Sequence, residues 1–539
     1  MLDKTREPVK ALATCEIVST SESGDKLSLK DNVEFMQGHA TRNVIHVYPE
    51  HGRQTVHGIG VSFTEASAFV LAHLDTDARG KVMQDIFGES GANFSMARTV
   101  IGACDFSVDG RWSYDDVKGD TGLSHFSVTK DFDGFSTEQY PHIRDPHFDL
   151  LPMIKQALAI KNEQADSVLK IIASAWTAPG WMKDIDDWYL PGNEQNGYAG
   201  TGGSLKVGYE RYYADYLIRY IESYRMHGID IWALTPVNEP LGNNGQWESM
   251  HFTPHSQNEF IKEHLGPALN DKGLGDIRIL MYDHNRDGLQ EWADVLYNDA
   301  ETASYLYGAA VHWYESSHKV SEDVLKQVHD AYPEFEIIHT EGCIDDLGKE
   351  APPGVLDPER FKESGWFGND SFWWNDNATD WAYSVTWDGV DAEDHPIYTP
   401  VHRYARNIIV SLNNWLSGWV DWNIVLDRQG GPNHVGNYCG APIMIDTESE
   451  EVYYTPIYYI LSQFSRTIRP GDRVVRISKM FGQYHDDIYS CATINDENLL
   501  TVQVLNTARQ EVPFYLQIKD QCANMKIDAN CLQTIRIQL

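Results

Sequence analysis

The chain has 539 residues, with 43 Lys and Arg against 79 Asp and Glu, which gives a formal net charge of −36. This acidity argues against nucleic acid as a partner, because phosphates need cationic side chains, and against an anionic membrane surface. Hydrophobic residues make up 42% of the chain, and the aromatic ones include 16 Trp. A composition of this kind fits a packed globular protein with a neutral polar ligand, and sugars are the obvious class.

The first residues, MLDKTREPVKALATCEIV, contain no apolar core of a signal peptide. Either a cytoplasmic protein or one secreted after signal removal is compatible with this start. No run of 18 apolar residues occurs, so no transmembrane segment is expected. The seven cysteines form no CxxC pair, which argues against a zinc ribbon and favours mostly reduced, buried thiols.

Residues 1–56 are polar with weak alternation, which predicts short strands. Short, nearly continuous apolar runs then recur at 57–66, 94–107, 167–179, 230–240, 277–285, 307–314, 335–342 and 416–426. Such runs are typical of strands buried on both faces of a parallel sheet. Amphipathic stretches at 147–161 and 209–228 predict helices between them.

Eight strand–helix units predict a (β/α)₈ TIM barrel over 57–438. The alternative, a doubly wound sheet, requires a Gly-rich phosphate loop after the first strand, and GIGVSF is not one. From 439 to 539 the pattern changes to short alternating strands such as RVVRISKM, LLTVQVLN and TIRIQL. We expect a β-sandwich there, completed by strands from residues 1–56.

One connection in the predicted barrel is unusually long, at 343–415 between the seventh and eighth strands. It contains Trp366, Trp373, Trp374, Trp381 and Trp387. The stretch 364–402 has no Lys or Arg and seven Asp or Glu, which we interpret as a solvated acidic loop. Its Trp cluster suggests a role at the rim of the site, in oligomerisation or in docking to a lipid interface.

Two glutamates stand at predicted strand ends, where barrel enzymes carry their active sites. Glu239 follows Asn238 at the end of the fourth strand, and Glu341 ends the seventh. A pair of carboxyl groups across a pocket is what cleavage of a glycosidic bond requires, one donating a proton and the other attacking the anomeric carbon.

Neighbouring residues fit the same chemistry. Asn238 is placed to hydrogen-bond a sugar 2-hydroxyl, and Tyr314, after the sixth strand, to hydrogen-bond the nucleophile. Trp176 and Trp422 are candidate stacking walls, and Asp105 a candidate acceptor from sugar hydroxyls. Core packing for the aromatics, and a structural partner such as Arg98 for Asp105, are the competing interpretations.

A metal site is the alternative at these strand ends, with Asp283, His284 and His312 as candidate ligands. No HExxH or similar spacing supports it, so no metal and no cofactor is predicted. Catalysis by Ser-His-Asp is disfavoured because the sequence lacks a G-x-S-x-G elbow.

The chain resembles glycoside hydrolase family 30, and within it the glucosylceramidase-like branch. The matching stretches include GIGVSFTEASA, ARTVIGACDFS, SAWTAPGWMK, ALTPVNEP, AVHWY, HTEGC and VDWNIVLDRQGGPNHVGNYCGAPIMID. They run in the right order from about residue 57 to 470.

The resemblance implies a barrel with a β-sandwich made from both chain ends, and retaining double displacement without metal or cofactor. It implies Glu239 as general acid/base and Glu341 as nucleophile. Positions that match the family's sugar contacts are Asp105, Trp176, Asn238, Tyr314, Trp422 and Asn437.

The expected substrate is a β-glucoside, a glycolipid or an oligosaccharide. The function that we expect first is that of a β-glucosidase or glucosylceramidase. The alternative is a β-1,6-glucanase or β-xylosidase that uses the same two glutamates. A non-catalytic carbohydrate-binding protein is a more distant alternative. We also expect the charge of Glu341, with partial burial, to raise the pKa of Glu239.

Overall fold

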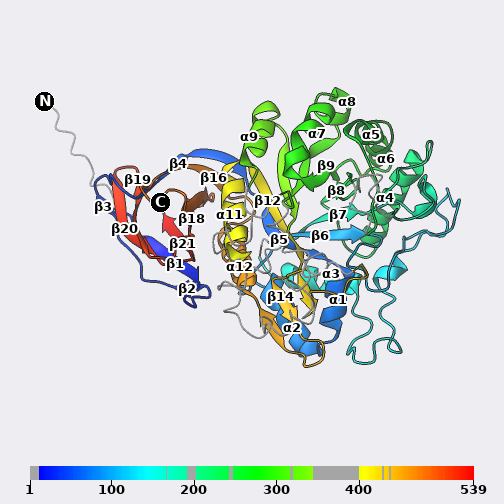
Figure 1. Ribbon diagram of the computed structural model, residues 1–539, viewed down its shortest axis with the longest axis horizontal. Coiled ribbons are helices and arrows are strands. Elements are labelled where there is room, and N and C mark those ends of the chain that lie inside the picture. Colours follow the sequence, from blue (N-terminus) through cyan, green and yellow to red (C-terminus); the bar gives the residue numbers. More distant parts are fainter. Residues whose placement is uncertain are drawn as a thin grey trace, which may run out of the picture.

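The computed structural model describes residues 11–165, 167–190, 202–241, 247–315, 320–343, 400–427, 430–435 and 439–539. Asn437 and the five tryptophans of 366–387 lie outside the described residues. Two units are visible in Figure 1, a barrel surrounded by helices and a large sheet that holds both the first and the last strands.

The eight predicted apolar runs form a closed barrel of parallel strands, which confirms the predicted fold class. The strands are β5 (Gly58–Phe63), β6 (Met96–Ile101), β7 (Lys170–Ala175), β8 (Ala233–Thr235), β9 (Arg278–Asn285), β10 (Leu306–His312), β11 (Glu336–Glu341) and β12 (Leu416–Asn423). They pair in chain order, and β12 closes the barrel against β5.

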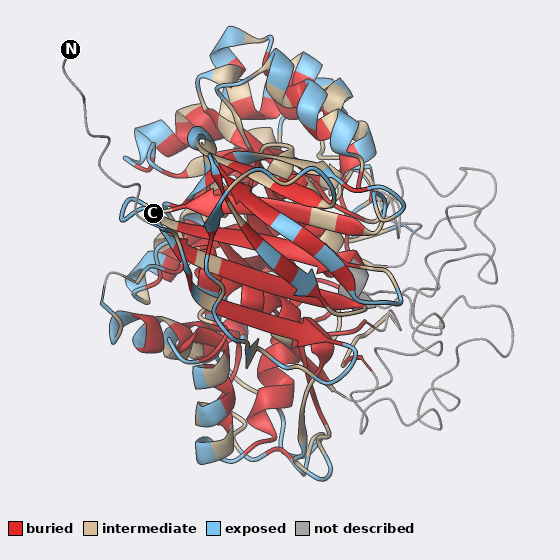
Figure 2. Cartoon of the chain, turned by 90° about the vertical axis from the view of Figure 1, so that its left-hand side faces the viewer, coloured by how far each residue is buried: buried red, intermediate tan, exposed pale blue. Residues whose placement is uncertain are grey.

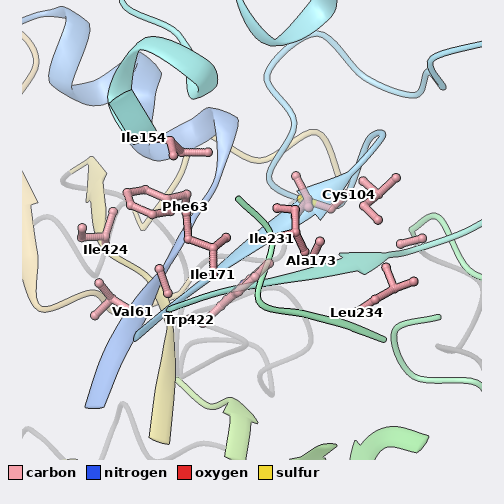
Figure 3. Packing of buried hydrophobic residues seen from close by; sticks show 14 of the residues in the cluster. Val61, Phe63, Cys104, Ile154, Ile171, Ala173, Ile231, Leu234, Trp422 and Ile424 are labelled. Carbon is pink, nitrogen blue, oxygen red and sulfur yellow. The ribbon is translucent and has the colours of Figure 1, made fainter. Parts of the chain in front are cut away.

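Alternate residues of these strands face the inside and the outside of the barrel, so both faces are apolar. A layer inside the barrel consists of Met96, Ile172, Ala233, Leu280, Ala310, Ile338 and Val420, all fully buried. On the outside, Val61 and Phe63 of β5 and Ile171 of β7 pack with Ile154 of the helix layer (Figure 3). Because the strands are buried on both faces, their sequences are continuous apolar runs.

Helices surround the barrel, and several begin at the capping residues that the sequence supplies. The larger ones are α1 (Glu65–Ala72), α2 (Thr76–Phe87), α3 (Leu150–Asn162), α4 (Glu210–Met226), α7 (Leu289–Leu296) and α9 (Glu322–Ala331). The shorter α5 (Pro254–Phe260), α6 (Gly266–Asp271) and α8 (Ala300–Ala303) lie between β8 and β10. Side chains of Thr64, Asp75 and Asp149 accept backbone N–H groups at the starts of α1, α2 and α3.

The second unit is a ten-stranded sheet built from both chain ends. Its N-terminal strands are β1 (Thr14–Ser21), β2 (Ser28–Leu29), β3 (Met36–Gln37) and β4 (Val44–Thr55). Its C-terminal strands are β16 (Arg473–Met480), β17 (Ile488–Ile494), β18 (Leu499–Asn506), β19 (Val512–Ile518), β20 (Gln521–Ile527) and β21 (Cys531–Gln538). Residues from both halves of the strand order share one hydrophobic core, so the sheet folds over itself as a sandwich. Figure 2 shows its largely buried strands facing the viewer.

Two helices connect the units (Figure 1): α11 (Pro400–Asn413) lies beside β17, and α12 (Pro456–Thr467) touches both β1 and β5. Ile460 and Phe464 of α12 are part of the barrel's core, and so are residues of the small sheet β13 (Val425–Asp427), β14 (Ile443–Ile445) and β15 (Val452–Tyr454). We therefore propose a boundary between barrel and sandwich after α12 rather than at residue 438. All seven cysteines are free thiols, five of them buried.

Candidate active site

Arg98 organises the carboxyl end of the barrel. It points inward from β6, two residues after Met96 of the inner apolar layer, and is fully buried. Its guanidinium donates to Ser174 Oγ at 2.9 Å, Asn238 Oδ1 at 2.7 Å and Asp283 Oδ2 at 2.8 Å, and also to Glu341 Oε2. A buried cation needs such compensation, so this arginine fixes the positions of the groups around it.

A β-bulge in β9 aims Asp283 at this arginine. The register of β9 against β10 shifts between Ala310 and Val311, and Tyr282 and Asp283 have φ values of +75° and +63°. Left-handed backbone at such residues costs about 1–3 kcal/mol each and persists only when its surroundings hold it. Gln257 Oε1 of α5 accepts the Tyr282 N–H at 3.0 Å and supports the bulge.

Asp283 is the main anionic partner at the barrel centre. Its carboxylate accepts from Thr235 Oγ1 at 2.7 Å, from Thr340 Oγ1 at 2.6 Å, from His312 Nε2 at 3.0 Å and from Arg98. Burial raises the pKa of Asp283, but Arg98 and His312 outweigh it and hold the pKa well below its usual range. Asp283 is therefore ionised throughout the range in which enzymes work.

Glu239 follows β8 with φ +46°, and its backbone N–H donates to Asp283 O at 2.9 Å. Its Oε1 lies 3.0 Å from His312 Nδ1 and 3.9 Å from His284 Nδ1. Burial raises the pKa of Glu239, but the hydrogen bond from His312 and the nearby positive charge bring it below the usual value. The raised pKa that the sequence predicts for Glu239 is therefore wrong, because the sequence did not reveal that His312 contacts it.

His312 itself lies between two carboxylates, since Nδ1 faces Glu239 and Nε2 faces Asp283. Both ring nitrogens must carry a hydrogen to serve two acceptors. Burial lowers the pKa of His312, but the charges of Glu341 and Asp283 and the two hydrogen bonds raise it to about 9. At neutral pH the proton of the Glu239–His312 pair thus resides on the imidazole.

Glu341 ends β11, where a register shift places it opposite His312 of β10. Its Oε1 accepts from Tyr314 Oη at 3.0 Å, and its Oε2 from Arg98. Burial and the charges of Glu239 and Asp283 raise the pKa of Glu341 overall, although His312 and Arg98 lower it. One oxygen each of Glu341 and Glu239 and a ring nitrogen of His312 lie within 4.8 Å of one another.

This trio is the one group of three or more His, Cys, Asp or Glu ligand atoms, within the described ranges, that is close enough to hold a metal ion. The contacts are those of a proton-transfer network instead. Arg98 and protonated His312 already neutralise the carboxylates, and both ring nitrogens of His312 act as donors.

The two predicted stacking residues lie side by side as one aromatic wall, and both are nearly fully buried in the barrel's hydrophobic core. Trp176 and Trp422 stack on each other with ring centroids 5.2 Å apart, and the guanidinium of Arg98 lies against both rings. Phe106, next to Asp105 in the chain, meets Trp422 edge to face at 5.9 Å. Asp105 is buried, and Arg98 is absent from its hydrogen-bond partners in the described part of the chain.

Several residues that position the site are not predicted in that role from the sequence. Arg98 is predicted only as a partner of Asp105 and His312 only as a metal ligand, and Gln257 carries no prediction. A signal exists for one of them, because an arginine in the middle of the apolar strand MARTVI must find buried anions. The bulges that aim Asp283 and Glu341 inward leave no comparable mark on the sequence.

A barrel whose fourth and seventh strands bring two carboxyl groups together is the architecture of a retaining glycosidase. A model of the glycosyl hydrolase family 30 TIM-barrel domain matches residues 56–352 and 384–468. The chain therefore belongs to glycoside hydrolase family 30 and is a retaining β-glycoside hydrolase.

Relatives agree with this family, and a solved structure shares the fold. Lysosomal acid glucosylceramidase of Mus musculus is 26% identical over 95% of this chain and 86% of its own. Endo-1,6-beta-D-glucanase neg1 of Aspergillus fumigatus is 27% identical over 85% of this chain and 80% of its own. The crystal structure of SrfJ from Salmonella typhimurium has the same fold, with a TM-score of 0.77 and 24% identity over 98% of this chain and 99% of that one. No helix within the described ranges is long and apolar enough to cross a membrane.

Proposed function

We propose that this protein hydrolyses β-glucosides, with Glu341 as the nucleophile and Glu239 as the general acid/base. The observation that carries the assignment is the approach of the two carboxyl groups to within 4.8 Å. Retaining glycosidases need a separation of roughly 5–5.5 Å, whereas inverting ones need about 6.5–9.5 Å to admit a water molecule.

The contacts of the two glutamates support these separate roles. Arg98 and Tyr314 both donate to Glu341, which orients its carboxylate for attack and stabilises its negative charge. Glu239 instead shares a proton with His312, so it has a proton source next to it.

In the first half-reaction the Glu239–His312 pair delivers its proton to the glycosidic oxygen. Glu341 attacks the anomeric carbon, the bond from that carbon to the leaving oxygen breaks, and a glycosyl ester forms on Glu341. In the second half-reaction Glu239 takes a proton from water, which attacks the same carbon and releases Glu341. The sugar leaves with its original anomeric configuration.

In this proposal, residues beside the two glutamates bind the sugar. Because Arg98 occupies Oδ1 of Asn238, the amide nitrogen of Asn238 remains to donate to a sugar 2-hydroxyl. Trp176 and Trp422 supply the aromatic wall, and Asp105 supplies a carboxylate for hydroxyl groups. Asn437 is included on the strength of the family resemblance alone.

Glucosylceramide or a simpler β-glucoside is the substrate that we propose, in line with the glucosylceramidase among the relatives. The glucanase relative supports β-1,6-glucan as the second candidate. Initial rates of the wild-type protein on an aryl β-glucoside, an aryl β-xyloside, glucosylceramide and β-1,6-glucan test the choice. Highest kcat/KM on the aryl glucoside and glucosylceramide is expected, and oligosaccharide products from β-1,6-glucan with no glucosylceramide turnover would overturn it.

A further inference from the structure

Three loops at the carboxyl end of the barrel meet at His434, which lies between β13 and β14. Its Nδ1 lies 3.0 Å from the carbonyl oxygen of Ser107, in the loop after β6. Its Nε2 lies 3.1 Å from Oε1 of Glu248, in the loop after β8. The backbone N–H of His434 also donates to the carbonyl oxygen of Asp105 at 3.3 Å.

The two ring nitrogens of His434 both face acceptor oxygens. Nδ1 lies within hydrogen-bond distance of a backbone carbonyl, and a carboxylate 3.1 Å from Nε2 favours a hydrogen there as well, so these surroundings favour the imidazolium form. Glu248 is fully buried, and Arg111 Nε lies 3.7 Å from the same oxygen, Oε1. Within the described ranges, neither oxygen of Glu248 nor Nε2 of His434 has a hydrogen-bond partner of good geometry, so the contact between them is an ion pair.

The charged and titratable groups near His434 are Glu248, Asp105 and, around Glu248, Arg111, Lys183 and Cys104. Burial lowers the pKa of His434, but the contact with Glu248 and the charges of Glu248 and Asp105 raise it overall. An uncompensated Glu248 in this position would be a buried charge, which is costly to maintain. Arg111 and Lys183 contribute to compensating this charge, and the ion pair of His434 with Glu248 is shorter than that of Arg111.

We propose that the His434–Glu248 ion pair is a positioning device for the sugar site, acting through the loop that carries Asp105. The charged ring ties the loops after β6 and β8 to the segment after β12, and so holds the backbone of Asp105 in place. His434 reaches the substrate only through Asp105, so it is a positioning residue rather than a catalytic one. This inference rests on the proposed function, which makes Asp105 a ligand of the sugar.

The substitution Glu248→Gln separates charge from geometry. A glutamine amide can donate to Nε2 of a neutral ring whose Nδ1–H still donates to Ser107. The variant therefore keeps the three loops together when His434 is neutral and loses the contact when acid protonates the ring. In the wild-type protein the dependence is the reverse, because the contact is lost when high pH removes the proton.

The test measures the inhibition constant of D-glucose against aryl β-glucoside hydrolysis from pH 5 to pH 9.5. We expect the wild-type constant to rise about fivefold, the equivalent of one hydrogen bond, as the pH passes above the ordinary histidine range. For Glu248→Gln the rise should appear at acid pH instead. For His434→Phe, which keeps a ring but no donors, the constant should be raised at every pH.

A matched control is His125→Gln, which removes a histidine from a similar but exposed pair with Asp120 and should leave the wild-type profile unchanged. The same pH profile in Glu248→Gln as in wild type, or a normal constant in His434→Phe, would overturn the inference. If the wild-type protein does not hydrolyse the aryl glucoside, the proposed function fails instead. The ion pair is then judged by histidine NMR titration, in which Glu248→Gln must lower the pKa of His434; an unchanged pKa refutes it.

Discussion

His312 Nδ1 lies 3.0 Å from Oε1 of Glu239, and this contact decides where the catalytic proton resides. A buried glutamate beside a second glutamate would ordinarily keep its own proton. Here the imidazole keeps it, because Asp283 and Glu341 also stabilise the positive charge of the ring. In the proposed mechanism the acid is therefore the pair rather than Glu239 alone.

The first prediction concerns the alkaline limb of the pH–rate profile. In the wild-type protein the pair loses its last proton near the pKa of His312, about 9, so activity persists to mildly alkaline pH. His312→Gln forces Glu239 to carry the proton itself. We expect kcat/KM on an aryl β-glucoside to fall about 10²-fold and its alkaline limb to move to lower pH by at least about one unit.

His284→Gln is the matched control for this prediction, because His284 approaches the same oxygen only to 3.9 Å. Burial lowers the pKa of His284, so this ring does not store the proton. Its substitution should leave the alkaline limb in place. An unmoved limb in His312→Gln would show that the pair does not hold the catalytic proton.

The second prediction concerns the hydrogen bond from Tyr282 N–H to Gln257 that supports the β9 bulge. Gln257→Leu leaves the buried Tyr282 N–H without its acceptor, a loss of about 1–3 kcal/mol that the strained bulge can relieve by shifting Asp283. We expect kcat to fall about tenfold with KM nearly unchanged, because Asp283 orients Arg98 and His312. Gln257→Glu keeps an acceptor oxygen and should recover most of kcat; equal defects in both variants would speak against this role.

The third prediction is a dependence of stability on pH that does not involve the active site. Burial raises the pKa of Asp131 to about 8, although the hydroxyls of Tyr114 and Tyr224 donate to it. The folded protein keeps this proton where the unfolded chain has lost it, so the free energy of unfolding falls as pH rises from about 4 to about 8. Asp131→Asn cannot ionise, and its melting temperature should fall less over that range.

Asp77→Asn, on the exposed surface of α2, serves as the control and should retain the wild-type slope. Melting temperatures of the three proteins between pH 4.5 and 8.5 provide the comparison. A slope in Asp131→Asn as steep as in wild type would place the pH dependence in other buried groups.

The sequence predicted the barrel because strands buried on both faces carry continuous apolar runs, and all eight runs became barrel strands. It also placed Glu239 and Glu341 at strand ends by position alone. It did not predict β20, where the polar Gln521 takes a buried position ahead of the alternating residues ANMKI, nor the packing of α12 on the barrel.

The electrostatics of the site could not be predicted from the sequence, for a different reason. The left-handed backbone at Tyr282 and Asp283 and the register shift before Glu341 depend on pairing between neighbouring strands. Both features redirect side chains by one position, which decides whether a carboxyl group meets Arg98 or His312. The direction of the pKa of Glu239 followed from those contacts and was predicted with the wrong sign.

In the proposed mechanism, Glu341 forms a covalent bond to the sugar. Incubation with a 2-deoxy-2-fluoro-β-glucosyl fluoride slows the second half-reaction and lets the glycosyl ester accumulate. Mass spectrometry of the digested protein should then find one 2-fluoroglucosyl group, on the peptide that contains Glu341. A label on Glu239, or inactivation with no covalent label, would contradict the account.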